Sequence, residues 1–393
     1  MGRKALRSLL PLIVLSCACS VSAERRADAL LEEMTVRQKV AQLVMVHNNG
    51  TEKPERAALL DTLVAQGLGG LIWMDGPVQP LVDQTVALQR ASAVPMLIAV
   101  DGEWGLSMRC PEYPKFPKQG VLGGLDDAEG LVYEMGRAIA AELKDVGIHV
   151  NFAPVVDINT NPDVQVLGLR AFGSDARRVA DYASAYMRGM QDGGILTSAK
   201  HFPGHGEASV DSHKDLPVLE LDRERIDSVE LLPFRRLIAE DVAMVMVGHL
   251  SVPALDPSGT PASISRPIMT DVLKGELGFK GLVVTDALEM RGLLNGRDSC
   301  AVVLEAFKAG ADLLLMPKDA QGAIDLVTAA VENGEVSVAE LDAKVRKMLL
   351  VKARLGLLNA RYDPSVRDVA SKVKKACRRD ERLIGRISRR MTE

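Results

Sequence analysis

The fold is decided by a stretch in the middle of the chain, where residues 194–206 read GILTSAKHFPGHG. The first half is a short apolar run that begins at a glycine, which is typical of a buried β-strand. The second half places one lysine and two histidines beside glycine and proline, and residues 211–213 add Asp-Ser-His. Three of the six histidines therefore fall within thirteen residues. A hydrophobic core does not need so many titratable groups, whereas a site that transfers protons or binds a polar ligand does.

The same arrangement of an apolar run followed by an amphipathic stretch recurs along the chain. The apolar runs cover residues 40–46, 69–74, 94–100, 149–156, 195–199, 242–248, 281–285 and 311–316. Stretches with helical periodicity cover residues 56–66, 82–91, 128–146, 176–192, 223–238, 301–309 and 320–332. Apolar strands that alternate with helices predict a parallel sheet covered on both faces. Eight such strands predict an α/β fold, a closed (β/α)8 TIM-type barrel that forms a single catalytic domain.

A doubly wound open sheet is the alternative fold. It requires a glycine-rich phosphate-binding turn after the first strand, and residues 46–50 read VHNNG, which is not such a turn. Just before the first apolar run, Thr35 and Gln38 have the spacing of a capping box, which predicts the start of a helix.

The N-terminus predicts export. The basic residues Arg3, Lys4 and Arg7 precede the apolar segment 9–15, and residues 21–23 read VSA, the small-residue pattern of a cleavage site. The apolar segment is too short to span a bilayer, so residues 1–23 are interpreted as a signal peptide of a periplasmic or secreted protein. Cys17 follows Val-Leu-Ser, which resembles a lipobox, and a lipid anchor at Cys17 is the competing interpretation. No later segment is long and apolar enough to predict a membrane span.

The remaining chain divides by charge. Residues 24–360 are assigned to the barrel, and residues 361–393 to a basic C-terminal helical tail with 11 basic and 5 acidic residues. The whole chain has 48 Lys and Arg against 52 Asp and Glu, so the barrel is acidic, which argues against nucleic acid as a partner. The sparse cysteines predict no disulfide framework, and no CxxC pair suggests a zinc site.

Polar residues follow five of the apolar runs, at the points where the strands should end. They are Asp101 and Glu103, then Asp157, then Lys200 and His201, then His249, and then Asp286. Because active sites of such barrels lie at the carboxyl ends of the strands, we expect these side chains to gather at one rim. Each residue also has a structural interpretation. Asp286 taken alone is typical of a strand-end cap, and a histidine beside an apolar strand, such as His249, is more often part of a core.

The Asp211-Ser212-His213 triplet points to acid–base chemistry. A carboxylate near an imidazole can fix its tautomer and raise its basicity, and such a histidine can protonate a leaving oxygen and then deprotonate water. Ser212 lacks the surroundings of a nucleophile elbow. A metal site built from the histidines and Asp211 is the alternative, but the spacings match no common zinc pattern, so neither a metal nor a cofactor is predicted.

Several segments are similar to glycoside hydrolase family 3 over nearly the full length that follows residue 23. Residues 31–43 resemble the opening helix and first strand of the family, residues 151–158 (NFAPVVDI) its fourth strand, residues 167–173 (LGLRAFG) its arginine loop, and residues 345–357 its last helix. Residues 200–206 with residues 211–213 resemble the bacterial β-N-acetylhexosaminidase subgroup, whose members are β-N-acetylglucosaminidases.

The resemblance implies a role for each site residue. Asp286 is the expected nucleophile, His213 the expected general acid and base, and Asp211 the residue that holds His213. The expected sugar-binding residues are Asp101, Arg109, Arg170, Lys200 and His201. The implied activity is that of a retaining exo-β-N-acetylglucosaminidase acting through a covalent glycosyl-enzyme on cell-wall-derived or chitin-like oligosaccharides, with a part in peptidoglycan turnover.

Two departures from the family pattern bear on these expectations. The common subgroup motif after the third strand is Asp-Gln-Glu-Gly-Gly, and here residues 101–105 read DGEWG, so the resemblance does not extend to the aglycone side. Trp104 is either a core residue or, beside Asp101 and Glu103, a platform for sugar stacking. The residues given after Tyr362 are too few for the second domain that supplies the acid/base in many family members, so His213 is expected to have no evident competitor. The alternatives are a β-N-acetylglucosaminide phosphorylase, a metal-dependent barrel hydrolase and a non-catalytic sugar-binding protein.

Overall fold

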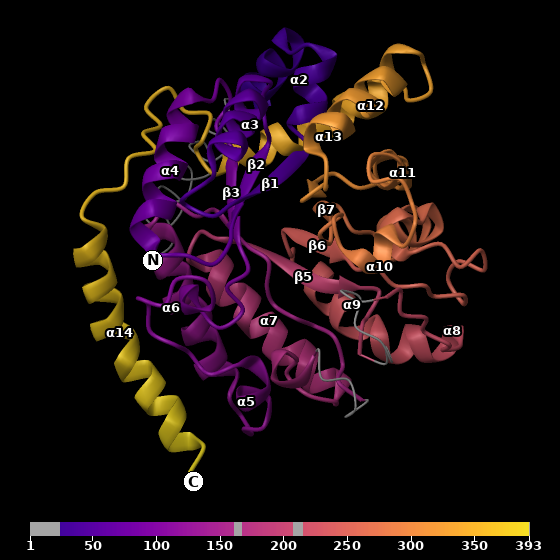
Figure 1. The fold of residues 1–393 in the computed structure, drawn as a ribbon. Helices are drawn as coiled ribbons and strands as arrows, with labels where there is room; N and C mark the ends of the chain where they lie inside the picture. The colour runs from indigo at the N-terminus through magenta and orange to yellow at the C-terminus, as the bar shows by residue number, and fades with distance from the viewer. Residues whose placement is uncertain (1–23, 161–166, 207–214, 393) are drawn as a thin grey trace, which may run out of the picture.

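The computed structural model describes residues 24–160, 167–206 and 215–392, and within these ranges it forms a (β/α)8 barrel (Figure 1). Eight parallel strands follow one another in chain order around the barrel. They are β1 (Val44–Asn48), β2 (Gly70–Trp73), β3 (Leu97–Val100), β4 (Val150–Asn151), β5 (Leu196–Phe202), β6 (Met244–Val247), β7 (Leu282–Thr285) and β8 (Leu314–Leu315). β8 pairs with β1, and the bridge between Leu313 and Val284 brings β7 beside β8 and closes the ring. The predicted barrel is confirmed, because every strand falls within or overlaps a predicted apolar run.

The helices surround the sheet (Figure 1). They are α2 (Val36–Ala41), α3 (Pro54–Ala65), α4 (Val78–Ala91), α5 (Gln119–Gly123), α6 (Glu129–Asp145), α7 (Ala176–Asp192), α8 (Arg223–Arg225), α9 (Leu232–Ala239), α10 (Arg291–Leu294), α11 (Ala301–Ala309), α12 (Ala320–Glu332), α13 (Val338–Arg354) and α14 (Val369–Arg390). The short 3₁₀ turns are η1 (Leu106–Met108), η2 (Gly168–Arg170) and η4 (Ala262–Ile264), and the π-helical segments are η3 (Ile226–Glu230) and η5 (Pro267–Glu276). The capping box before β1 is confirmed, since Thr35 Oγ1 accepts from Gln38 N and Gln38 Oε1 accepts from Thr35 N at 2.9 Å.

One predicted helix is interrupted. Residues 223–238 form three segments, α8, the π-helical turn η3 and α9, instead of one continuous helix. Pro233 lies at the start of α9 and has no N–H to bond the carbonyl four residues earlier. Leu231 N instead donates to the carbonyl of Ile226 at 2.9 Å, the longer spacing of a π-helical turn. The hydrophobic periodicity of this region survives the break, which explains why the sequence predicts a single helix.

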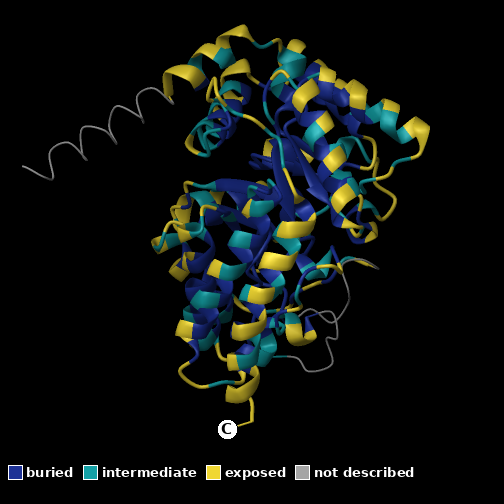
Figure 2. Cartoon of the chain, turned by 90° about the vertical axis from the view of Figure 1, so that its left-hand side faces the viewer, coloured by how far each residue is buried: buried dark blue, intermediate teal, exposed yellow. Residues whose placement is uncertain are grey.

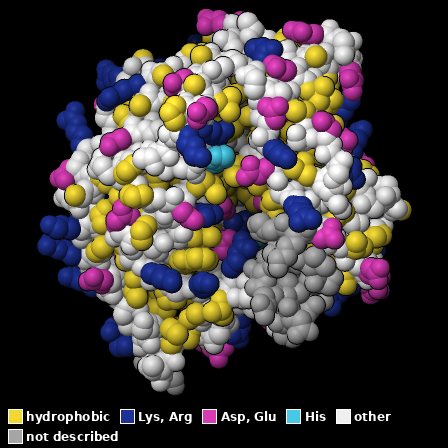
Figure 3. All heavy atoms as spheres, viewed as in Figure 1, with side chains coloured by type: hydrophobic (Ala, Val, Ile, Leu, Met, Phe, Trp, Pro, Cys, Tyr) yellow, Lys and Arg dark blue, Asp and Glu magenta, His cyan; other side chains and the backbone are white. Residues whose placement is uncertain are grey.

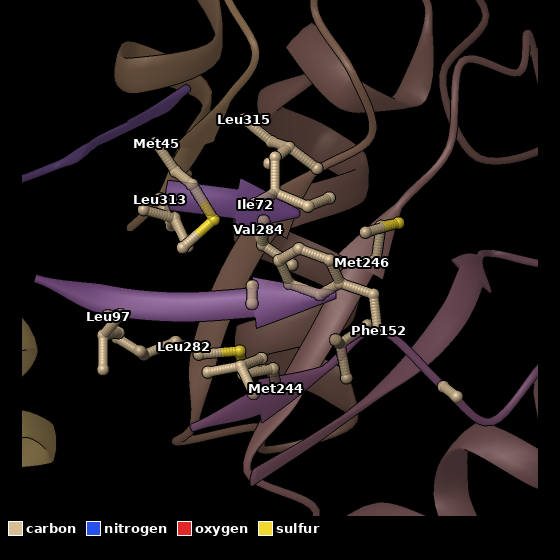
Figure 4. Close-up of a cluster of buried hydrophobic side chains, with 14 of the residues drawn as sticks. Met45, Ile72, Leu97, Phe152, Met244, Met246, Leu282, Val284, Leu313 and Leu315 are labelled. Carbon is tan, nitrogen blue, oxygen red and sulfur yellow. The ribbon is translucent and has the colours of Figure 1, made fainter. Parts of the chain in front are cut away.

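The barrel is filled by apolar side chains from strands on all sides of the ring. Figure 4 shows Met45, Ile72, Leu97, Phe152, Met244, Met246, Leu282, Val284, Leu313 and Leu315 packed together inside it. Buried residues lie along the strands and the inner faces of the helices, whereas exposed residues lie on the outer helix faces (Figure 2). Ile72, Met246 and Leu315 are at the same time the apolar floor of a cavity at the carboxyl end of the barrel.

The basic C-terminal segment forms helix α14, which lies along the outside of the barrel beside α6 (Figure 1). Val369, Ala376, Leu383 and Ile387 are buried on its inner side, while most of its Lys and Arg side chains are exposed. Burial of one apolar edge holds the helix on the barrel wall. Among the described residues, no helix is both long and apolar enough to cross a bilayer.

Candidate active site

A cavity of about 450 Å³ opens at the carboxyl ends of the strands. Its lining includes residues that the sequence analysis assigned to the site, namely Asp101, Arg109, Arg170, Lys200, His201 and Asp286. The other lining residues include Glu103, His205 and Glu289, together with the methionines Met74, Met108, Met246, Met290 and Met316. Basic, acidic and histidine side chains come together near the centre of the face shown in Figure 3. The barrel therefore collects residues that are far apart in the sequence around one cavity.

Asp286 stands directly after β7, on the wall of the cavity. Its backbone N–H donates to the Val247 carbonyl at 2.9 Å, which anchors it to β6, and its Oδ1 accepts from Ala287 N at 2.8 Å. Burial opposes ionisation of this carboxyl, but the neighbouring His201 and His249, the Ala287 N–H and Lys200 together lower the pKa of Asp286 to about 2. Asp286 is therefore ionised at neutral pH, as a carboxylate nucleophile must be.

A buried carboxylate that the sequence placed at the rim, but to which it gave no role, organises the cationic wall of the cavity. Glu103 is fully buried, and Arg170 donates to both of its oxygens, at 2.6 and 3.0 Å. Lys200 Nζ lies 2.9 Å from the same carboxylate and 2.8 Å from Asp101 Oδ1. Burial alone would raise the pKa of Glu103, but Lys200 and Arg170 hold it well below its usual value. Glu103 thus fixes the direction of both cations.

Arg109 joins the same network from its edge. Its guanidinium donates to Asp101 Oδ2 at 3.2 Å and to Asp75 Oδ1 at 3.0 Å. Asp101 is half-buried and accepts from both Lys200 and Arg109, whereas Asp75 is exposed. Alternating cations and carboxylates of this kind present both hydrogen-bond donors and acceptors to a ligand.

Asp157 organises the loop that follows β5. Its Oδ2 lies 2.7 Å from His201 Nδ1, and its Oδ1 accepts from the backbone N–H groups of His201 and His205 at 3.1 and 2.8 Å. Burial raises the pKa of Asp157, but His201 and His205 together outweigh this effect and the net shift is downward. The bond at Nδ1 leaves Nε2 as the nitrogen with which His201 can meet a ligand. The sequence placed Asp157 at the rim but did not show this contact.

The glycine-rich motif after β5 has a packing reason. Gly206 lies so close to residue 158 that a Cβ atom there would stand 1.7 Å from the Ile158 carbonyl oxygen. His205, which lies between two glycines of this motif, lines the cavity, and burial lowers its pKa. Asp211 and His213 lie in residues 207–214, outside the described residues, so their roles stay predictions.

Two other sequence interpretations can be compared with the structure. His249 is buried, with Nδ1 2.6 Å from Ser263 Oγ and Nε2 2.9 Å from the Ala287 carbonyl, so it fits the interpretation as a core histidine and also holds the residue after Asp286. Trp104 is not among the residues that line the cavity. It packs against the core, with Lys118 Nζ 4.9 Å from the centre of its ring, so the suggested stacking platform is not found.

The described parts of the chain contain no group of three or more His, Cys, Asp or Glu side chains arranged to hold a metal ion. The polar residues of the cavity are instead paired as cations with carboxylates. The arrangement suits a hydroxyl-rich ligand next to an ionised carboxylate in a barrel rim, which is a common setting for sugar hydrolysis.

Comparison with known proteins agrees with this assignment. Residues 35–351 match the Glycosyl hydrolase family 3 N terminal domain, and the chain belongs to this family. The chain is 34% identical over 296 residues to "Beta-hexosaminidase A" of Pseudoalteromonas piscicida, with 69% of this chain and 50% of that protein covered. It is 33% identical over 318 residues to "Beta-hexosaminidase" of Idiomarina loihiensis, with 79% of this chain and 93% of that protein covered. The chain thus spans about half the length of the first relative and nearly all of the second.

The fold is shared with solved structures of the family. A glycoside hydrolase family 3 beta-N-acetylglucosaminidase from Paenibacillus sp. str. FPU-7 superimposes with a TM-score of 0.81 at 35% sequence identity. The superposition covers 91% of this chain and 69% of that chain. The expected family and the expected barrel are therefore both confirmed.

The position of Glu103 predicts an unequal cost for removing two carboxylates of the same network. Glu103→Gln leaves Lys200 and Arg170 buried with too little negative charge, and should lower the free energy of unfolding by about 3 kcal/mol. Asp75→Asn removes an exposed partner of Arg109 and should cost less than about 1 kcal/mol. Urea denaturation of both variants measures the difference. Equal losses in the two variants would show that Glu103 does not organise the cations.

Proposed function

We propose that this protein is a retaining exo-β-N-acetylglucosaminidase that removes terminal non-reducing β-N-acetylglucosamine from oligosaccharides. The observation that carries the proposal is the meeting of ionised Asp286 with Lys200, Arg170 and His201 in one cavity of a family 3 barrel. The relatives named beta-hexosaminidase and the neighbouring beta-N-acetylglucosaminidase structure support the same class of substrate.

The first chemical step forms a covalent glycosyl-enzyme. Asp286 attacks the anomeric carbon with its carboxylate oxygen, and the glycosidic oxygen leaves as it takes a proton from His213. Asp211 holds His213 in the required tautomer. The roles of His213 and Asp211 rest on their place in the sequence motif, whereas the ionised state of Asp286 rests on its surroundings in the barrel.

The second step releases the sugar. Neutral His213 takes a proton from water as the water attacks the same anomeric carbon, and Asp286 leaves as a carboxylate. Two displacements at one carbon retain its configuration. A histidine base is neutral where a carboxylate base would be anionic, so phosphate could approach in place of water, which keeps phosphorolysis as the alternative outcome.

The sugar-binding wall explains the proposed selectivity. Lys200, Arg170 and His201 offer donors, and Asp101 offers acceptor oxygens, to hydroxyl groups and to a 2-acetamido carbonyl. A buried site of this kind rejects analogues that leave its polar atoms unpaired.

The proposal also includes export. The N-terminal sequence supports a periplasmic, secreted or Cys17-anchored protein. The substrate class supports action on cell-wall-derived or chitin-like fragments during peptidoglycan turnover.

The direct test compares two aryl glycosides. The aryl β-N-acetylglucosaminide should be hydrolysed at least about 100-fold faster, in kcat/KM, than the aryl β-glucoside, because only the first fills the acetamido site. The assay is run with and without inorganic phosphate, and the product is identified as the free sugar or the sugar phosphate. Equal rates on both glycosides contradict the substrate class, and a sugar phosphate as main product replaces hydrolysis by phosphorolysis.

Asp286→Asn separates the nucleophile from a strand-end cap. As the nucleophile, Asp286 is needed for the covalent intermediate, and the substitution should lower kcat by roughly three or more powers of ten with the fold kept. As a cap it would cost about 1 kcal/mol of stability and leave turnover largely intact. Steady-state kinetics and circular dichroism on the purified variant distinguish the two. A folded Asp286→Asn protein with near-normal turnover removes the assignment.

His213→Ala tests the acid/base role. The variant should lose roughly 100-fold or more with poor leaving groups and much less with activated aryl glycosides, because only a poor leaving group needs the proton. Azide needs no general base, so it should restore turnover and give a β-glycosyl azide. Asp211→Asn should show a milder defect, because it acts only through His213. If good and poor leaving groups are slowed equally and azide has no effect, the acid/base is another residue.

A further inference from the structure

A pair of buried carboxyl groups connects the C-terminal helix to the wall of the cavity. Glu142 of α6 and Asp380 of α14 are both fully buried, and they are neighbours where the two helices pack together. Two neighbouring carboxyl groups can hydrogen-bond to each other only if one of them carries a proton. The pair lies where α14 packs on α6, and neither residue lines the cavity.

The partners of each group indicate which one holds the proton. Arg379 donates to both oxygens of Asp380, at 2.6 and 2.7 Å, so both of these oxygens act as acceptors. Glu142 Oε2 accepts from Leu106 N at 2.9 Å. The remaining oxygen, Glu142 Oε1, is buried and receives no hydrogen bond from a donor group among the described residues. A proton on Glu142 Oε1, donated to Asp380, satisfies every atom of the pair.

The contact with Leu106 leads to the ligand cavity. Leu106 begins η1, which carries Met108, and Arg109 follows it; both Met108 and Arg109 line the cavity. Gly105, just before η1, has φ +95°, and a Cβ atom there would stand 3.1 Å from Glu142 Oε2 and 3.0 Å from the Phe116 ring. The loop thus packs directly on the Glu142 carboxyl, and this contact fixes the distance between the loop and α6.

We propose that neutral Glu142 is a positioning residue that ties helix α14 to the cavity loop containing Arg109, and that its ionisation as the pH rises loosens both and weakens sugar binding. Ionised Glu142 would face the Asp380 carboxylate across a buried contact, where like charges repel strongly. The part concerning sugar binding rests on the proposed function, whereas the linkage between the helices does not.

The surroundings of Glu142 favour this assignment. The titratable or charged groups that face it are Asp380, Arg379 and Cys377 from α14, Cys110 and Tyr113 from the loop after β3, and Tyr186 from α7. Burial, and then Asp380, raise the pKa of Glu142 well above its usual value, against the effects of Leu106 N–H and Arg379. Burial also raises the pKa of Cys110 to about 12 and shifts those of the two tyrosines and Cys377 upward, which favours the neutral form of each of these groups.

The sign of the stability change follows from this shift. The folded protein holds the Glu142 proton to higher pH than the unfolded chain does, so the stabilisation is complete below the unfolded pKa. It is lost as the pH rises from that value through the folded pKa. A glutamine at this position reproduces the neutral acid at every pH, because its amide N–H donates to Asp380 and its carbonyl accepts from Leu106 N.

The experiment measures KM on the aryl β-N-acetylglucosaminide and the thermal midpoint between pH 5 and 9. In the native protein, KM should rise and the midpoint should fall toward pH 9. Glu142→Gln should keep KM within about twofold of the native low-pH value across the range. It should also remove the part of the fall in the thermal midpoint that the ionisation of Glu142 causes. Glu134→Gln is the matched control, since Glu134 is an exposed carboxylate of α6 that pairs with Arg386 of α14, and it should follow the native profile.

Two more variants make each part falsifiable. Asp380→Asn places an amide that can donate to ionised Glu142, and should also flatten the rise of KM. Glu142→Ala should raise KM at every pH by roughly threefold to tenfold, the effect of one lost hydrogen bond. Superimposable pH profiles of native protein and Glu142→Gln would falsify the proposal, and a native-like Asp380→Asn profile would remove the role of α14. If no variant hydrolyses the glycoside, the proposed function fails, while the thermal midpoints still test the linkage.

Discussion

The closure of the parallel sheet is the constraint on which the rest of the molecule depends. Because every strand runs in the same direction, all eight carboxyl ends meet at one rim, and the bridge between Leu313 and Val284 completes the ring. Side chains at the carboxyl ends of β3, β5 and β7 therefore line the same cavity. The apolar layer of Ile72, Met246 and Leu315 closes the barrel below them and forms the cavity floor. The core of the fold and the site therefore share one boundary.

The charged side chains at this boundary can be buried only because each of them has a neighbour of opposite charge. Lys200 and Glu103 are almost completely removed from solvent, and a single buried charge there would be costly. Arg170 and Asp101 complete a network in which each charge has an opposite neighbour. The network also leaves Asp286 ionised, since Lys200 and the nearby imidazoles outweigh its burial. Electrostatic pairing and readiness for nucleophilic attack are thus properties of the same arrangement.

Much of the fold and part of the site could be predicted from the sequence. Each strand overlaps an apolar run, because strands buried on both faces give a hydrophobic signal that is local in sequence. Asp101, Lys200, His201 and Asp286 could be placed at the rim because each follows such a run. Glu103 and Asp157 could not be recognised as organising groups, since their importance lies in contacts with residues 67 and 44 positions away. The break at Pro233 was hidden because helical periodicity continued across it.

The sequence by itself determined the order of strands and helices, the chemical types at the strand ends and the family, because these depend on local patterns. Only the tertiary structure decided which charges pair, which carboxyl is fully buried and how the C-terminal segment is used. From composition, residues 361–393 are a basic tail, but α14 buries an apolar edge and places Asp380 against Glu142. A pKa depends on burial and on neighbours in space, and no local pattern encodes either one before the chain has folded.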